Sequence, residues 1–365
     1  MVLRTVLILC LVAAQGCATL GAQTLPDVQA AYNDSLAVTQ DTQFLLNIVR
    51  ARYRDTPAFL DVASLTTQQT MLSTAGLSVS VPLSPTAVPP GVGVTPGATL
   101  GGTMSVTPTT TFAPVRGDDF VKRLVTPVSL QTVAMVASSG WSIARVLQLT
   151  VDRLNRITNA PTATGPTPDL SPDVSRFISL TRALRALQLE EQLTIGATRD
   201  ESSGDQGYLS FTCDPDASPN FATVRDLLDL PERTLRLRLT EDRTRVDGDT
   251  LRLHMRSVLG AIFYLSQGVE VPPEHEARGL VTITRDAQGK RFDWQTVLDG
   301  NFRVHFSREE PANAAVRVKH RDTWFFIADD DLESKTTFML LIQLFNMQAG
   351  RNALPVPLLT IPAGR

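Results

Sequence analysis

Fifty-four consecutive residues, Val62 to Val115, contain no Asp, Glu, Lys or Arg. Charged residues make up 19% of the whole chain, so the average composition does not account for a charge-free stretch of this length. Ser, Thr, Gly and Pro interrupt the stretch throughout, whereas a membrane-spanning helix needs about 20 mainly apolar residues in a row. The stretch is therefore not a helical membrane span, and the rest of the chain has to fold on either side of it.

Within this stretch, apolar residues alternate with Thr, Ser and Gly over residues 73–83 and again over residues 98–108. A Pro- and Gly-rich segment, residues 84–97, separates the two alternating arms. Alternation with a period of two on both sides of a turn predicts a long β-hairpin with its apolar positions on one face. The apolar positions that we expect to mediate assembly are Leu77, Val79, Val81, Leu100, Met104 and Val106.

Three environments for this arm remain open from the sequence. The hairpin or flexible arm can pack on its own domain or on a partner protomer. It can enter a membrane as part of an oligomer, because each arm has about the 9–11 residues that a tilted membrane strand needs, although several protomers would have to pair their edges. Phe112 is its only aromatic residue, whereas membrane strands carry aromatic girdles. A composition rich in Thr, Pro and Gly also fits a disordered arm.

The N-terminus has the pattern of an export signal, residues 1–17. Arg4 precedes a short apolar run, residues 6–14, that is too short to span a bilayer. The following segment, Ala14-Gln15-Gly16-Cys17, resembles the lipobox of bacterial lipoproteins. The resemblance implies cleavage before Cys17, lipidation of Cys17 and, with Ala18 next, anchoring in the outer membrane of a Gram-negative-type bacterium. The alternative is a secreted or periplasmic protein cleaved after Ala18.

Two further segments resemble a group of bacterial lipoproteins with no known activity. Residues 44–62, FLLNIVRARYRDTPAFLDV, match a run of the form LLNxVRxRYxDTPxFLDV that follows the signal in that group, and residues 324–331, WFFIADDD, are similar to it as well. Because no activity is known for the group, the resemblance transfers no functional residue.

The predicted fold class is α+β, with mixed helices, short antiparallel strands and the uncharged hairpin or arm inserted near the N-terminus. We expect a tether and N-terminal helix over residues 18–61, with the helix itself over 26–54, and the arm over 62–115. A helical region over 116–160, a Pro-rich linker over 161–172 and an α+β domain over 173–365 follow.

Individual helices and strands can be predicted in the part of the chain that follows the arm. Ser129 is expected to cap a helix over 130–138, and Ser142 a helix whose apolar face continues to Ile157. Asp249 is expected to cap a helix over 250–267 with Gly268 just beyond its end. Strands are expected near 193–198, 208–212, 235–239, 281–284, 302–306, 316–320, 323–328 and 356–361, with helices over 173–189, 222–228 and 332–347, the last apolar almost all round.

The search for chemistry gives no catalytic, cofactor or metal site. A net charge of -3 argues against a nucleic-acid partner. The four histidines lack the spacing of a zinc pair, and Cys213 is expected to be a structural free thiol without a disulfide partner. The acidic run at 329–331 is expected to cap the last helix through Asp330 and Glu333.

These observations predict a lipid-anchored cell-envelope protein with a structural or assembly role, self-associating through the 62–115 arm. Its expected partners are the membrane, through the lipid, and further copies of the chain. The alternative is a periplasm-facing binding module for an envelope polymer or a secreted partner, with a monomeric α+β domain. An enzyme of an unrecognised class is the least favoured interpretation, because the sequence contains no recognisable acid-base or nucleophile constellation.

Overall fold

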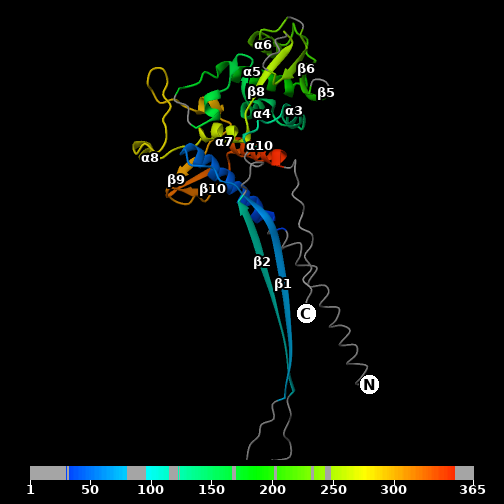
Figure 1. Cartoon of the computed structure of the whole chain (residues 1–365), viewed down its shortest axis with the longest axis vertical. Helices are drawn as coiled ribbons and strands as arrows, with labels where there is room; N and C mark the ends of the chain where they lie inside the picture. The colour runs from blue at the N-terminus through cyan, green and yellow to red at the C-terminus, as the bar shows by residue number, and fades with distance from the viewer. Residues whose placement is uncertain are drawn as a thin grey trace, which may run out of the picture. The chain divides into compact units, whose positions relative to one another are not determined.

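The computed structural model describes residues 30, 33–79, 96–114, 122, 124–166, 170–200, 204–231, 234–242 and 248–349 (Figure 1). The chain divides into two compact units. One takes its residues from 1–58 and 116–354, and we call its described part the body. The other contains residues 59–115 and 355–365, and we call its two described strands the hairpin. The predicted terminal strand at 356–361 lies outside the described residues, as does the signal segment.

The hairpin consists of β1, Leu60–Val79, and β2, Pro96–Pro114, paired antiparallel over their whole length. Its register sets Leu77 opposite Ala98, Ala75 opposite Leu100 and Met71 opposite Met104. Directly opposed residues share a face of a sheet, and so do residues two apart on a strand. The predicted apolar positions of both arms therefore lie on the same face, and Thr, Ser and Gly positions predominate on the other. Most of the predicted turn region, together with Val81, lies outside the described residues.

The body is a mixed α+β structure, which confirms the predicted class. Its larger sheet has the strand order β4-β3-β8-β7-β6-β5, in which only β7 and β8 run parallel. These strands are β3 (Val151–Leu154), β4 (Ile157–Thr158), β5 (Leu193–Asp200), β6 (Gly204–Phe211), β7 (Arg236–Thr240) and β8 (Thr250–Met255). Strands from before and after residues 161–172, the predicted linker, thus belong to one sheet, and Pro161–Thr164 form the short helix η1.

Helices cover this sheet and close its core. They are α3 (Leu130–Ser138), α4 (Ile143–Thr150), α5 (Ser175–Leu189), α6 (Pro219–Leu228) and α7 (Val258–Ser266). Apolar side chains of α3, α4 and α5 meet those of β5 to β8, among them Val133, Ile143, Leu180, Leu184, Leu209 and Leu253. The predicted strand near 235–239 is confirmed as β7, in which Leu237 and Leu239 are buried while Arg236 is exposed.

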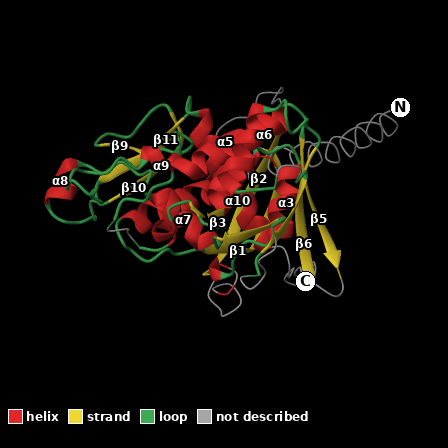
Figure 2. Ribbon diagram, turned by 90° about the horizontal axis from the view of Figure 1, so that it is seen from above, coloured by secondary structure: helices red, strands yellow, loops and turns green. Residues whose placement is uncertain are grey.

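A smaller antiparallel sheet has the order β10-β11-β9, formed by Ala314–His320, Thr323–Ala328 and His305–Ser307. Short helices α8 (Pro273–Ala277) and α9 (Gln295–Leu298) precede it, and the long helix α10 (Leu332–Ala349) follows. Both views of the molecule place this sheet and the β5–β6 edge of the larger sheet on opposite sides of the body, with α5, α7 and α10 between them (Figures 1 and 2).

The N-terminal helix spans residues 33–52 in the described part of the chain. Its apolar side is buried at Phe44, Leu45 and Ile48, and the Phe44 ring meets Phe345 of α10 edge to face at 4.9 Å. Buried Asn47 fixes the chain that leaves this helix, because its amide oxygen accepts from the Ala58 N–H and its amide nitrogen donates to the Ala58 carbonyl, both at 2.9 Å.

The predicted helix over 250–267 is wrong in its first half. Residues 250–255 form strand β8, and α7 begins at Val258 with the Ser257 hydroxyl, not Asp249, accepting from the Gly260 N–H at 3.0 Å. Leu251, Leu253 and Met255 are buried in alternation, which is the period of a strand. The predicted place of Gly268 one residue past the helix C-cap, Gln267, is confirmed.

Three further predictions need correction. The helix from Ser142 ends at Thr150, because Val151 is already extended and the chain turns through Asn155, with φ 49°, between β3 and β4. Residues 281–284 form no strand; only a bridge at Arg285 lies nearby. Helix α10 buries one face only: Leu340 and Leu341 are buried, whereas the Met339 side chain is exposed.

Candidate functional site

The N-terminal helix ends in Arg52-Tyr53-Arg54-Asp55, and each of these four side chains contacts a different part of the body. The helix stops because Arg54 adopts a positive φ of 61° and the Asp55 N–H bonds back to the Arg50 carbonyl at 2.9 Å. Arg54 donates to the Thr282 hydroxyl at 2.8 Å. Arg52 enters a pocket, while Tyr53 and Asp55 join a buried aromatic cluster.

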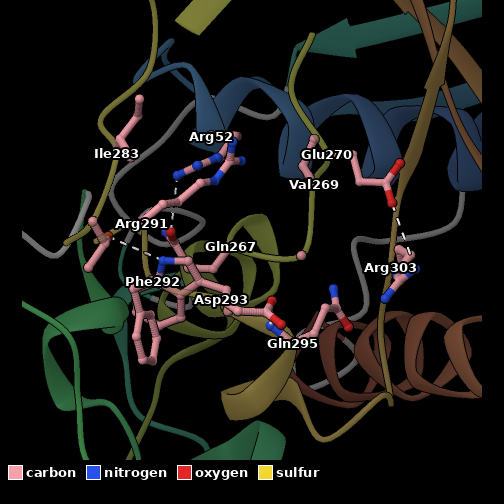
Figure 3. Close-up of a pocket in the computed structure, with 13 residues that line it drawn as sticks. Arg52, Gln267, Val269, Glu270, Ile283, Arg291, Phe292, Asp293, Gln295 and Arg303 are labelled. Atoms are coloured by element: carbon pink, nitrogen blue, oxygen red, sulfur yellow. Dashed lines mark hydrogen bonds and ion pairs between the residues drawn. The ribbon is translucent and has the colours of Figure 1, made fainter. Parts of the chain in front are cut away.

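The pocket has a volume of about 390 Å³ and draws its walls from distant parts of the sequence (Figure 3). Arg52 enters from the N-terminal helix, and the segment after α7 supplies Gln267 and Glu270. The remaining lining residues are Gly268, Val269, Ile283, Thr284, Arg291, Phe292, Asp293, Trp294, Gln295 and Arg303. A ligand site of this size suits a small organic molecule.

Backbone pairing holds two walls of the pocket together. The Glu270 N–H donates to the Val304 carbonyl at 2.9 Å, and the Val304 N–H donates to the Gly268 carbonyl at 3.0 Å. Gly268 is required by this close approach, because a Cβ there would lie 2.8 Å from the carbonyl oxygen of Phe302. The pairing sets Glu270 and Arg303 side by side, with 3.9 Å between carboxylate and guanidinium.

Arg52 is the pocket's buried cation. Only 6% of it is exposed, and its Nη1 donates to Gln267 Oε1 at 3.1 Å. Its Nε has no hydrogen-bond partner, and no carboxylate of the described residues pairs with it. Burial lowers the pKa of Arg52 to about 10, with Glu276 opposing the shift and Arg291 adding to it. Arg52 is therefore still a cation at neutral pH.

The other charges of the pocket have partners. Arg291 pairs with Glu276 at 2.8 Å, outside the pocket wall. The Glu270 carboxylate pairs with the Arg303 guanidinium at 3.9 Å and lies 3.1 Å from His305 Nδ1. The Asp293 carboxylate accepts the Gln295 N–H at 2.9 Å. The three arginines of the lining thus face three engaged carboxylates, those of Glu270, Asp293 and the neighbouring Glu276. Arg52 alone among these arginines has no carboxylate partner in the described residues, and this favours an anion as the pocket's ligand.

A buried cluster beside this segment joins Tyr53 to two histidines. The Tyr53 hydroxyl lies 2.7 Å from His275 Nδ1, and its ring meets His320 edge to face at 5.3 Å. Asp55 accepts from His320 at 3.0 Å and pairs with Arg321 at 3.0 Å. Burial raises the pKa of Tyr53 to about 12 and lowers the pKa of both His275 and His320. Tyr53, His275 and His320 are therefore neutral at neutral pH and lie beside the Asp55–Arg321 ion pair, and the cluster ties the helix end to α8 and β10.

The sequence-predicted site residues fall in three places. Leu77, Val79, Leu100, Met104 and Val106 lie in the paired strands of the hairpin, with Val79 opposite Pro96 and Val106 opposite Gln69. Val81 and Cys17 lie outside the described residues. Cys213 is a buried free cysteine, and burial raises the pKa of its thiol.

The histidines and the acidic run behave differently from expectation in two respects. His254 was expected on a helix but lies on strand β8, where its Nδ1 is 2.7 Å from Asp152. Asp331, one residue later than predicted, caps α10: its carboxylate accepts the Ser334 N–H at 3.0 Å. Glu333 instead pairs with Arg145 of α4. The described residues contain no cluster of three or more His, Cys, Asp or Glu side chains that could hold a metal ion.

Comparisons with protein-family models, curated proteins and solved structures find no match for this chain. Within the part of the chain that the structure describes, no helix is both long and apolar enough to cross a bilayer.

Sequence reasoning missed the pocket altogether. The Arg52 side chain is buried among residues more than 200 positions away in the sequence, and no local pattern at the helix end predicts these contacts. The only available signal was the segment Arg52-Tyr53-Arg54-Asp55, in which four consecutive polar or aromatic residues follow the apolar residues of the helix.

Proposed function

We propose that this chain is a lipid-anchored cell-envelope protein that self-associates through its hairpin into a sheet shared between copies. The observation that carries the proposal is the hairpin itself: two strands of 20 and 19 residues, paired only with each other among the described residues. At about 3.4 Å per residue, each strand is about 65 Å long. A lone two-stranded hairpin is marginally stable in water, so its two outer edges favour further strand pairing.

The absence of charge supports another copy of the chain as the partner. Proteins that keep sheet edges from pairing place charged residues on them, and the only charge on either strand of this hairpin is Asp61, at its base. When identical hairpins pair, every charged residue is present in each copy and repels the equivalent residue of the neighbouring copy. A charge-free hairpin avoids that repulsion at every position, whatever the register between copies.

Lipidation at Cys17 would favour the same outcome. An acylated N-terminus confines copies to one surface and raises their local concentration. The hairpin, which follows the N-terminal helix directly in the chain, would then meet other hairpins in the same orientation. Identical protomers that associate in this way commonly close into symmetric rings.

The test introduces a repeated charge on one face of the hairpin. Thr70, Thr74 and Ser78 lie on the same face of β1, opposite Ser105, Gly101 and Gly97. Copies paired through adjacent hairpins would hold equivalent residues about 10 Å apart, which equals the screening length at about 0.1 M salt, so the repulsion is strongest in more dilute buffer. We expect the detergent-extracted full chain to have the mass of a discrete oligomer, and the triple Asp variant of these residues to be monomeric.

The matched control is the triple Asn variant, which has nearly the same shape without the charge. We expect it to keep the oligomeric mass of the unmodified chain. Equal masses for the triple Asp and triple Asn variants, or a monomeric unmodified chain, would contradict the proposal.

A further inference from the structure

We propose that the pocket around Arg52 binds a small organic anion through its carboxylate or phosphate group. This site goes beyond the assembly role, because all its walls belong to the body. It is lined by residues of the N-terminal helix, the segment after α7 and the segments before α9 and β9 (Figure 3).

The first argument is the unmet bonding capacity of Arg52. A guanidinium has five N–H donors in a planar fork, and Arg52 uses Nη1 for one bond to Gln267 while its buried Nε has none. A buried donor without a partner is costly. Oxygen atoms of a carboxylate or phosphate fit this fork in pairs, which makes such an anion the natural complement.

The second argument is the contrast with the other fully enclosed arginine of the body. Arg256 is also buried, but it donates to the carbonyls of Gln148 and Val151 and to the Thr164 hydroxyl, and its guanidinium lies 4.1 Å above the Tyr264 ring. The fold therefore satisfies a structural arginine with fixed acceptors and an aromatic face. Arg52 faces a pocket instead, and this difference indicates a bound ligand.

The third argument is the chemistry of the surrounding wall. Arg291 lines the same pocket and is held by Glu276 at 2.8 Å. Trp294 is held in place because its indole N–H donates to the Thr284 hydroxyl at 3.2 Å, and the Phe292 ring meets it edge to face. A ligand with an anionic end and an apolar body would therefore find cations and aromatic surface in one cavity.

Binding can be measured with two probes that share an apolar body and differ in the anionic group. Benzoate and phenyl phosphate are titrated into the full-length protein at constant ionic strength, with benzyl alcohol as the uncharged analogue, and binding is followed by calorimetry. We expect saturable binding of at least one anion and none of benzyl alcohol. The preferred anion distinguishes a carboxylate ligand from a phosphate ligand.

Two variants test the role of Arg52. Arg52→Gln should weaken anion binding about tenfold or more, the loss expected for a charge-assisted hydrogen bond. The control, Arg317→Gln, removes an exposed arginine that pairs with Glu310 far from the pocket lining, and should bind as the unmodified protein does.

The second variant keeps the proposal testable if Arg52→Gln does not fold. Gln267→Glu replaces the amide beside Arg52 Nη1 by a carboxylate of nearly the same shape. Arg52 then has an anionic partner within the chain itself. We expect a higher melting temperature together with loss of anion binding. Unchanged binding in Gln267→Glu, or no saturable binding of either anion to the unmodified protein, would overturn the proposal.

Discussion

Arg256 is a charged residue in the core of the body and has no exposed surface. Its guanidinium joins the end of α4, the start of β3 and helix η1, through bonds to Gln148 and Val151 at 2.8 and 3.0 Å and to Thr164 at 3.2 Å. Burial lowers its pKa to about 10, so it remains charged at neutral pH. One side chain thus holds together three elements of the body.

Replacing Arg256 should therefore destabilise the body strongly. Arg256→Met leaves several buried carbonyls short of a donor, and we expect the free energy of unfolding to fall by about 3 kcal/mol or more. Urea denaturation followed by circular dichroism measures the change. Arg317→Met, at an exposed position, should cost no more than about 0.5 kcal/mol, and equal effects at both positions would show that Arg256 is not a structural hub.

His275 and His320 give the body a defined response to acid. Burial lowers the pKa of both below the ordinary histidine value, so the unfolded chain takes up protons at a higher pH than the folded chain does. As far as these two histidines determine it, the free energy of unfolding should have its full value above about pH 7 and decrease as the pH falls toward 5. Protonated His275 could also no longer accept the Tyr53 hydroxyl proton at Nδ1.

The pH dependence can be assigned by substitution. His275→Gln should reduce the loss of stability between pH 7 and pH 5, measured by urea denaturation at each pH. His254→Gln is the control, because 48% of that side chain is exposed. An unchanged pH slope in His275→Gln would exclude this histidine as its source.

Individual elements were predictable where a local signal marks both ends. Helix α3 follows Ser129, whose hydroxyl accepts the Thr132 N–H at 3.2 Å, and ends before Gly140, which has a φ of 99°. Strand β7 shows its alternation in two leucines and two arginines. Strand β8 was missed because Asp249 was interpreted as the cap of one long helix. The period-two alternation of Leu251, Leu253 and Met255, and Ser257 directly before α7, were the local signals of a strand followed by a helix.

The pocket was not predictable for a different reason. Its residues are separated by long stretches of chain, and Arg52 meets Gln267 only because the N-terminal helix packs on α10 and ends beside the segment after α7. Local patterns fix the type of an element, whereas the residues that two elements bring together depend on packing between them. The segment that ends the N-terminal helix combines such contacts, since Asn47, Arg52, Tyr53 and Asp55 all make buried or paired contacts with other parts of the chain.

At the level of the whole chain, the proposal assigns membrane attachment to a lipid on Cys17. Two or more acyl chains hold a protein on a bilayer stably, since each buried methylene contributes about 0.8 kcal/mol. We expect Cys17→Ala to move the protein from the membrane fraction to the soluble fraction after cell lysis and ultracentrifugation. Cys213→Ala should stay with the membrane, and a Cys17→Ala protein that also stays there would contradict lipid anchoring at this residue.

Self-association through the hairpin is the central claim, and charge complementation between copies tests it most directly. The triple Asp variant of Thr70, Thr74 and Ser78 is mixed with the corresponding triple Lys variant, and the mass of the detergent-extracted mixture is measured by light scattering. Each variant alone should be monomeric because its charges repel, whereas the mixture should recover an oligomer containing both variants, weakened by added salt. A mixture that remains monomeric, while the triple Asn control is oligomeric, would contradict pairing between hairpins of different copies.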